Sequence, residues 1–300
     1  MAKNKRPILT VFIILGIIAL ILGASMMIVL KMADPTSDLS FSEKIGVIPI
    51  EGAIFDSHET LSQLLRFRED KKIKVIVLQI NSPGGAVGPT QEIYREVRKT
   101  METKKVVASL GGVAASGGYY IAAAADKIVA NPGTITGSIG VLMEFMRFED
   151  LLDKIGIKLE VLKSGEFKDI GSPHRELTKR DREIIDSLIA DIQGQFVEAV
   201  ANGRGLPLEK VNKIADGRVF SGAKAKELEL VDVLGNFQDA VDVAKDMAGI
   251  KGDATLVYPK KSRMELWESF LEGTARSVTK VIQGIKPRLE YKWSGLIATD

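Results

Sequence analysis

One serine of this chain stands where it could serve as a nucleophile. Ser116 lies within Gly111–Tyr120 (GGVAASGGYY), and the apolar stretch before it, Val106–Leu110, predicts a strand. The alanine-rich stretch after it, Ile121–Ala125, predicts a helix. A serine at such a turn points its hydroxyl outward, and the amide of Gly117 would lie at a helix N-terminus, which stabilises developing negative charge. Alternatively, the small residues only let a helix pack closely, and Ser116 fills space.

A second glycine loop, residues 81–87 (NSPGGAV), directly follows a continuous apolar strand predicted for Lys74–Ile80. In an open α/β sheet, ligands bind in the crevice beyond the strand C-termini. The N–H groups of Gly84 and Gly85 could therefore point at an oxyanion or hold an extended peptide, although an ordinary Pro-Gly turn has the same composition. Two such loops after successive strands favour a site. Neither has the spacing of a phosphate-binding motif, so nucleotide binding has little support.

A serine hydroxyl is a weak nucleophile and needs a base. The chain has two histidines, His58 in a polar helix start and His174 in a turn expected to be exposed, and both are poorly placed. A lysine can serve instead where burial lowers its pKa from about 10.4 towards about 7. Lys168 lies among apolar residues, but nothing in its spacing separates it from Lys163 or Lys127. The residues alone therefore indicate a lysine base without deciding which one.

Composition excludes several other classes of protein. With 41 basic and 39 acidic residues the net charge is +2, so there is no electrostatic case for binding nucleic acid. The absence of cysteine excludes thiolate catalysis, disulfides and cysteine zinc sites. Three hundred residues, 45% of them hydrophobic, suffice for one large domain or two small ones.

The N-terminal region predicts a membrane anchor. Residues 7–30 carry no charge, and at ~1.5 Å rise per residue a helix of this length crosses a hydrocarbon core of about 30 Å. Gly23–Ser25 could imitate a signal-peptide cleavage site, but the apolar run continues through Met26–Leu30, which favours an uncleaved anchor. Basic residues precede the span, so we expect a single-pass protein of the cell membrane with a cytoplasmic N-terminus and its catalytic domain outside the cytoplasm.

The remaining sequence alternates between strand and helix patterns, which predicts an α/β fold with a mostly parallel sheet. The expected elements are strands Ile45–Ile50, Lys74–Ile80 and Val106–Leu110 and helices Thr60–Glu69 and Thr90–Met101. A longer helix is predicted for Leu177–Asn202, with capping chemistry from Thr178 and Asp181 at its start.

We expect five segments along the chain: a cytoplasmic N-terminus (1–6), the anchor (7–30), a linker (31–43), a peptidase domain (44–258) and an amphipathic tail (259–300). The tail contains both tryptophans, Trp267 and Trp293. It could lie on the membrane or join a partner helix. Packing on its own subunit or on a neighbouring one is the reading we favour.

Five motifs stand in an order that resembles the signal peptide peptidase A family in its short form. They are Asn81–Gly85, Ala115–Ile121, Gly133–Val141, Phe167–Pro173 and Asp216–Gly222, and the resemblance covers about residues 44–248. It implies the fold of the Clp protease and crotonase superfamily, built from repeated ββα units. It also implies a Ser–Lys serine endopeptidase that cuts signal peptides left in the membrane after secretion.

Carried over motif by motif, the resemblance places the nucleophile on Ser116 and the general base on Lys168. The oxyanion would be bound by the amide of Gly117 and by that of Gly84 or Gly85. No metal or other cofactor is implied.

The resemblance also gives Ser138 a role, since it falls where a hydroxyl can hold the lysine amine. Short members of the family assemble into rings in which the dyad is completed across a subunit boundary. We therefore expect a homo-oligomeric ring in which Ser116 meets Lys168 of a neighbour. The expected partners are signal peptides, other peptide substrates and the membrane, and not nucleic acid.

Three other functions compete with this one. A crotonase-type acyl-CoA enzyme would use glycine-loop amides without needing a serine and a lysine together. An α/β-hydrolase with His174 as base would need a Gly-x-Ser-x-Gly elbow, whereas residues 114–118 read AASGG. The chain could also be a membrane-anchored scaffold that holds peptides without cutting them.

Overall fold

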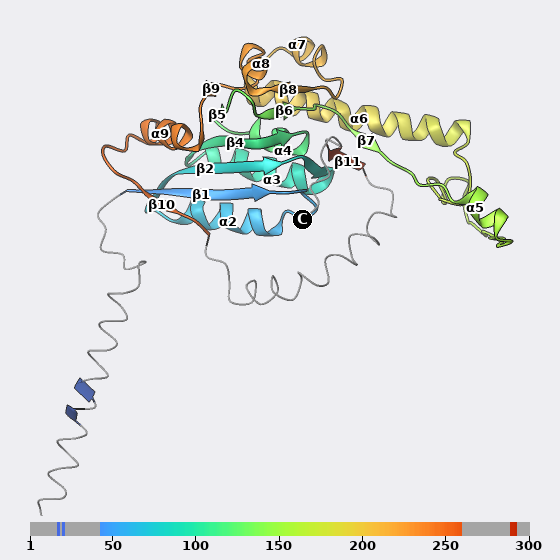
Figure 1. Ribbon diagram of the computed structural model, residues 1–300, viewed down its shortest axis with the longest axis horizontal. Coiled ribbons are helices and arrows are strands. Elements are labelled where there is room, and N and C mark those ends of the chain that lie inside the picture. The colour runs from blue at the N-terminus through green and yellow to red at the C-terminus, as the bar shows by residue number, and fades with distance from the viewer. Residues whose placement is uncertain (1–16, 19, 22–42, 260–288, 293–300) are drawn as a thin grey trace, which may run out of the picture. The chain divides into compact units, whose positions relative to one another are not determined.

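The computed structural model describes residues 17, 18, 20, 21, 43–259 and 289–292 (Figure 1). The chain divides into two units between Ser42 and Glu43, and the sheet belongs to the second. Most of the predicted anchor, linker and tail lie outside the described residues. Over the part of the chain that is described, no helix combines the length and apolar character needed to cross a bilayer.

The centre of the second unit is a parallel sheet with the strand order β10-β1-β2-β4-β5-β9 (Figure 1). Its central strands are nearly continuous apolar runs, as expected for a sheet buried on both faces. The prediction of an α/β fold with a mostly parallel sheet is therefore confirmed. The strands are β1 (Lys44–Glu51), β2 (Ile73–Ser82), β4 (Lys105–Ala115), β5 (Lys127–Ala130), β9 (Val233–Leu234) and β10 (Thr255–Val257).

Helices cover both faces of this sheet, and an apolar cluster lies on each face. Because side chains alternate along a strand, successive residues of one strand join different clusters. Ile76 and Leu78 of β2 share one apolar cluster with Phe196, whereas Val75 and Val77 share another that includes side chains of α9. The first cluster contains residues of α2 (His58–Glu69), α3 (Val87–Met101), α4 (Gly117–Ala122) and α6 (Lys179–Arg204), and the second contains residues of α9 (Phe237–Ala248).

The predicted elements have the right type, and their limits shift by a few residues. β4 continues beyond the predicted end at Leu110 as far as Ala115, which delivers the chain to Ser116. The long helix α6 begins two residues later than predicted, at Lys179. Its capping chemistry is confirmed, because the Thr178 and Asp181 side chains each accept a backbone N–H from the other residue.

Several short elements have no counterpart among the predicted ones, because two to six residues are too few to show a periodicity. β3 and β7 flank β11 in a second, three-stranded sheet, and β6 pairs with both β4 and β8. These elements are β3 (Gly84–Ala86), β6 (Ile135–Gly137), β7 (Leu142–Met143), α5 (Glu149–Lys154), α7 (Leu208–Asn212), β8 (Val219–Ser221), α8 (Gly222–Glu227) and β11 (Leu289–Lys292).

The short helix α4, which follows Ser116, is held by its two tyrosines. Tyr119 is fully buried, and its hydroxyl donates to the carbonyl of Leu230 at 2.9 Å. The ring of Tyr120 packs between those of Tyr94 and Phe196, with centroids 5.0 and 4.8 Å apart. Such contacts fix α4 against α3, α6 and the loop before β9.

The long helix α6 contacts the end of α4 through a glycine. A methyl group added at Gly203 would lie 1.9 Å from the carbonyl oxygen of Ala123, a distance no real Cβ contact allows. Nothing lies within 4 Å of the same added atom at Gly194, in the same helix. Of these two glycines of α6, only Gly203 is therefore required for packing.

We expect Gly203→Ala to lower the free energy of unfolding by about 2 kcal/mol, because α6 must move away from α4. Gly194→Ala is the matched control and should stabilise the protein by up to ~1 kcal/mol through helix propensity. Chemical unfolding of the detergent-solubilised chain, followed by circular dichroism, measures both. Equal effects of the two substitutions would contradict the packing account.

Candidate active site

Ser116 occupies a strained turn between β4 and α4, as its strand-to-helix position predicts. Its backbone has φ 53° and ψ −116°, which is rare for a residue other than glycine. The turn is held from both sides, since the Ser116 N–H donates to the carbonyl of Gly137 at 2.8 Å and the Ser116 carbonyl accepts from Tyr120 at 2.8 Å. Strain of this kind persists where the surrounding structure enforces it, and it concentrates at functional sites.

The hydroxyl of Ser116 is buried without a partner. The residue is 1% exposed, and within the described residues its Oγ makes no hydrogen bond. An unpaired buried hydroxyl is costly, so its presence points to a group that the isolated chain does not supply.

The two glycine loops meet at this turn, as the sequence predicts. A Cβ added at Gly117 would lie 2.9 Å from Oγ1 of Thr90, 3.1 Å from Cα of Gly84 and 3.2 Å from the nitrogen of Gly85. Gly84 has φ 99°, and a Cβ at Gly85 would lie 2.1 Å from the carbonyl oxygen of Ile54. Glycine is therefore required at all three positions, by close approach or by backbone conformation.

The amides of Gly84 and Gly85 face different neighbours. The Gly84 N–H donates to Oγ of Ser82 at 3.1 Å. The N–H of Ile54 donates to the carbonyl of Gly84 at 2.9 Å, and the N–H of Ala86 donates to the carbonyl of Ile54 at 2.7 Å. Because backbone groups alternate along a strand, the N–H and carbonyl of Gly85 face the opposite edge of β3. That edge is where β11 lies.

Ser138 lies at the same end of the sheet as Ser116. β6 runs parallel to β4 with Gly137 opposite Ala115, so each serine is the residue that follows the paired strands. Ser138 is also buried and has a positive φ of 51°. Its N–H donates to the carbonyl of Arg218 at 2.9 Å. The structure thus brings together Ser116, Ser138 and the three predicted glycines.

The structure does not bring Lys168 to Ser116 within one chain. Lys168 lies in the arm, which we define as residues 144–178 between β7 and α6, and the arm extends away from the sheet past α5 (Figure 1). Neither His58 nor His174 binds the Ser116 hydroxyl, which has no partner among the described residues.

The three candidate lysines differ in their ionic partners. Nζ of Lys127 lies 3.1 Å from the carboxylate of Asp232, and Nζ of Lys163 lies 2.7 Å from that of Asp169. In the described part of the chain, the ammonium group of Lys168 makes no hydrogen bond or ion pair, and the residue is exposed. Sequence reasoning left these lysines equivalent, and the structure leaves only Lys168 unpaired among the three.

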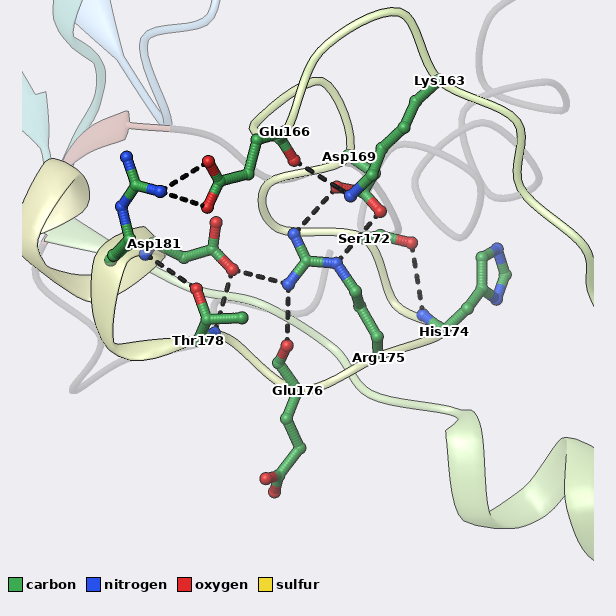
Figure 2. A network of polar contacts seen from close by, with 10 residues as sticks. Lys163, Glu166, Asp169, Ser172, His174, Arg175, Glu176, Thr178 and Asp181 are labelled. Atoms are coloured by element: carbon green, nitrogen blue, oxygen red, sulfur yellow. Dashed lines mark hydrogen bonds and ion pairs between the residues drawn. The ribbon is translucent and has the colours of Figure 1, made fainter.

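A network of ion pairs fixes the loop around Lys168 to the start of α6 (Figure 2). The guanidinium of Arg175 donates to both carboxylate oxygens of Asp169, at 2.8 and 3.0 Å, and to Asp181. The hydrogen bonds from Arg175, and to a lesser extent the one from Lys163, hold the pKa of Asp169 well below its usual range. The hydrogen bond from Arg175 also lowers the pKa of Asp181 to about 2. Asp169, the neighbour of Lys168 in sequence, is thereby fully occupied by other cations.

Asn81 positions the strand that ends at Ser116, a role that its sequence motif did not reveal. β2 and β4 pair from Val75 to Ile80, and the register then shifts, because β4 carries two more residues than β2 over this interval. Oδ1 of Asn81 accepts from the N–H of Val113 at 3.1 Å within this bulge. Beyond it, β4 leaves β5 and pairs with β6. The side-chain bond therefore helps to set the direction of the last residues before Ser116.

Two protein families and three relatives that this chain resembles are described as proteases or peptidases. The family described as "Peptidase family S49" matches residues 98–251, and that described as "Clp protease" matches residues 37–134. A Synechocystis protein named "Putative protease slr0021" is 46% identical over 215 residues, 71% of this chain and 78% of the relative. "Putative signal peptide peptidase SppA" of Enterococcus faecium is 31% identical over 284 residues, 85% of this chain and 82% of the relative. "Serine protease SPPA, chloroplastic" of Arabidopsis thaliana is 33% identical over 254 residues, 84% of this chain and 37% of the relative.

Substitution of Asn81 tests its positioning role. Asn81→Ala should slow the labelling of Ser116 by a fluorophosphonate about tenfold, because a small displacement of a reacting group is costly. Asn81→Asp keeps an acceptor for the Val113 N–H and should label within about threefold of the parent chain. Gly203→Ala controls for general destabilisation. If it slows labelling as much as Asn81→Ala does, the positioning role is wrong.

The ion-pair network predicts how the arm responds to acid. The folded-state pKa of Asp181 lies below the ~3.9 of an unfolded aspartate. The stabilisation that ionised Asp181 gives the folded arm is therefore complete above about pH 4 and is lost as pH falls towards 2. Amide-exchange protection of residues 165–172 should fall over that window. Arg175→Gln should already remove it at pH 7, whereas Lys179→Gln, which breaks only an exposed pair with Glu183, should not. Protection that persists in Arg175→Gln would refute this account.

Proposed function

The chain belongs to peptidase family S49, that of signal peptide peptidase A, and on this premise we propose that it is a membrane-anchored serine endopeptidase that degrades remnant signal peptides with a Ser116–Lys168 dyad. Its fold would be that of the Clp protease and crotonase superfamily, with its repeated ββα units. Residues 7–30 would anchor it in the cell membrane, with residues 1–6 in the cytoplasm and the peptidase domain outside.

The unpartnered hydroxyl of Ser116 carries this proposal. It is buried on a strained turn, beside the backbone of Gly84, Gly85 and Gly117. A nucleophile needs a base on one side and oxyanion donors on the other, and only the donors come from the same chain.

Lys168 is the base in this proposal, for two reasons. The family motif falls on it, and among the three lysines left open by the sequence it is the one with no carboxylate partner in the described structure. The capture of Asp169 by Arg175 and Lys163 supports the same assignment, because a carboxylate beside a lysine would keep it charged.

The reaction is acyl transfer. Lys168 takes the proton of Ser116 as Oγ attacks the scissile carbonyl, and the tetrahedral oxyanion is bound by the amide of Gly117 and one amide of the Gly84–Gly85 pair. The lysine then gives its proton to the leaving amine. Water, activated by the same lysine, attacks the ester and frees Ser116. The hydroxyl of Ser138 holds the lysine amine in line throughout.

The dyad is completed between subunits of a ring. The arm that carries Lys168 exposes many apolar side chains, which favours coverage by a second copy of the chain. Each arm would then bring its Lys168 to Ser116 of a neighbour. The exposed residues are Met146, Leu151, Ile155, Ile157, Leu159, Val161 and Leu162 of the arm and Ile184 and Leu188 of α6.

Mixing two inactive variants tests both the dyad and its location. Ser116→Ala and Lys168→Ala should each lower hydrolysis of a synthetic signal peptide by roughly a thousandfold. Rings reassembled from equal amounts of both should recover about a quarter of the parent activity, because one site in four receives both intact residues across a head-to-tail interface. The full chain in detergent is used throughout.

Lys158→Ala, an exposed lysine of the same arm, is the matched control and should retain activity. No recovery on mixing would reject the shared dyad. Full activity of Ser116→Ala would reject the serine mechanism and leave a crotonase-type use of the glycine loops as the better account.

A further inference from the structure

Gln193 of α6 donates to the backbone of two separate loops. Its Nε2 lies 2.8 Å from the carbonyl oxygen of Ala215 and 3.4 Å from that of Ile139. Ile139 directly follows Ser138, and Ala215 directly precedes the Asp216–Gly222 motif. The proposed reaction gives that motif no role. One side chain of the long helix thus joins the loop of Ser138 to a motif further along the chain.

The same two loops are bound to each other around Ser138. The Ser138 N–H donates to the carbonyl of Arg218 at 2.9 Å, and the N–H of Gly217 donates to the carbonyl of Ile139 at 3.1 Å. A Cβ added at Gly140 would lie 3.0 Å from Cα of Gly217, so the two backbones are in contact. Ser138 has a positive φ of 51°, a conformation that persists only where surrounding contacts enforce it. These contacts, with the two bonds from Gln193, supply that constraint.

The chemistry of the contact requires a donor with two hydrogens. Two carbonyl oxygens face the end of the Gln193 side chain, so its NH₂ group and not its oxygen must lie there. Oε1 is consequently buried, and it has no hydrogen-bond partner among the described residues. An unpaired buried acceptor is costly, so the amide contributes little net stability. Its particular effect is on where the two carbonyls lie.

We propose that Gln193 is a positioning residue for the Ser–Lys reaction, which holds the loop of Ser138 against the Asp216–Gly222 motif so that the Ser138 hydroxyl stands in line with the Lys168 amine. Gln193 itself touches neither substrate nor the reacting atoms, and it acts through Ser138. A displaced hydroxyl would hold the amine out of line with Ser116, which slows proton transfer without changing how the peptide binds. The effect on the reaction rests on the proposed function, whereas the hold on the loop does not.

Gln193→Met tests the proposal in the full chain in detergent. Methionine has nearly the same shape and no amide, so it exchanges one unpaired acceptor, Oε1, for another, the carbonyl of Ala215. The carbonyl of Ile139 keeps its bond from Gly217. The free energy of unfolding should therefore change little. Gln195→Met, on the exposed side of the same helix, is the matched control, because that amide contacts only side chains.

Amide exchange reports the hold on the loop. We expect residues 138–140 and 217–218 to exchange faster in Gln193→Met than in Gln195→Met, while the two variants keep the same midpoint of chemical unfolding. Equal exchange would show that Gln193 does not fix the loop, and a midpoint lowered in Gln193→Met alone would show that the amide serves stability instead. This comparison does not depend on hydrolysis, so it decides the structural part of the proposal whether or not the chain cleaves signal peptides.

The kinetics of cleavage of a synthetic signal peptide report the effect on the reaction. Gln193→Met should lower kcat about tenfold and leave KM unchanged. In a Ser138→Ala background the same substitution should lower kcat by less than about twofold, because the hydroxyl that it displaces is already absent. An equal loss in both backgrounds would show that Gln193 does not act through Ser138, and an unchanged kcat would refute the positioning role. Failure of the parent chain to hydrolyse the peptide would instead reject the proposed function.

Discussion

The site depends on a close approach of backbone to backbone, where the loop of Gly84 and Gly85 meets the first residue of α4. No side chain fits between them at Gly85 or Gly117. The approach is made by β4, which leaves β5 for β6 and ends on the strained Ser116. Buried tyrosines of α4 hold the far side of the turn. Tertiary packing thus stabilises a conformation that the local sequence disfavours.

The sequence predicts those parts of this arrangement that follow from local pattern. Continuous apolar runs indicate the parallel strands, and Thr178 with Asp181 marks the start of the long helix. The position of Ser116 between a strand and a helix is correct for the same reason. Glycine spacing also predicts that two loops share one edge of the sheet, since parallel strands end together.

The remainder depends on long-range contacts that no local pattern encodes. β7 and β11 are too short to be periodic, and Leu289 pairs with Met143 across nearly half of the chain. Lys163 is distinguished from Lys168 by the carboxylate of Asp169, which it meets only after folding. Asn81 reads as part of a turn, and its bond to Val113 exists only because β4 carries a bulge at that point.

The contact of Gly203 with Ala123 gives the chain a mechanical property. α6 has 26 residues, and this contact lies near one end while the loop of Lys168 is tied to the other. At a rise of ~1.5 Å per residue the helix is about 39 Å long, so a tilt of about 5° at its base moves its tip by roughly 3 Å. Because the last turns of α6 are packed against the core by Phe196 and Val200 as well as by this glycine contact, the position of the loop at the other end depends on how that base is seated.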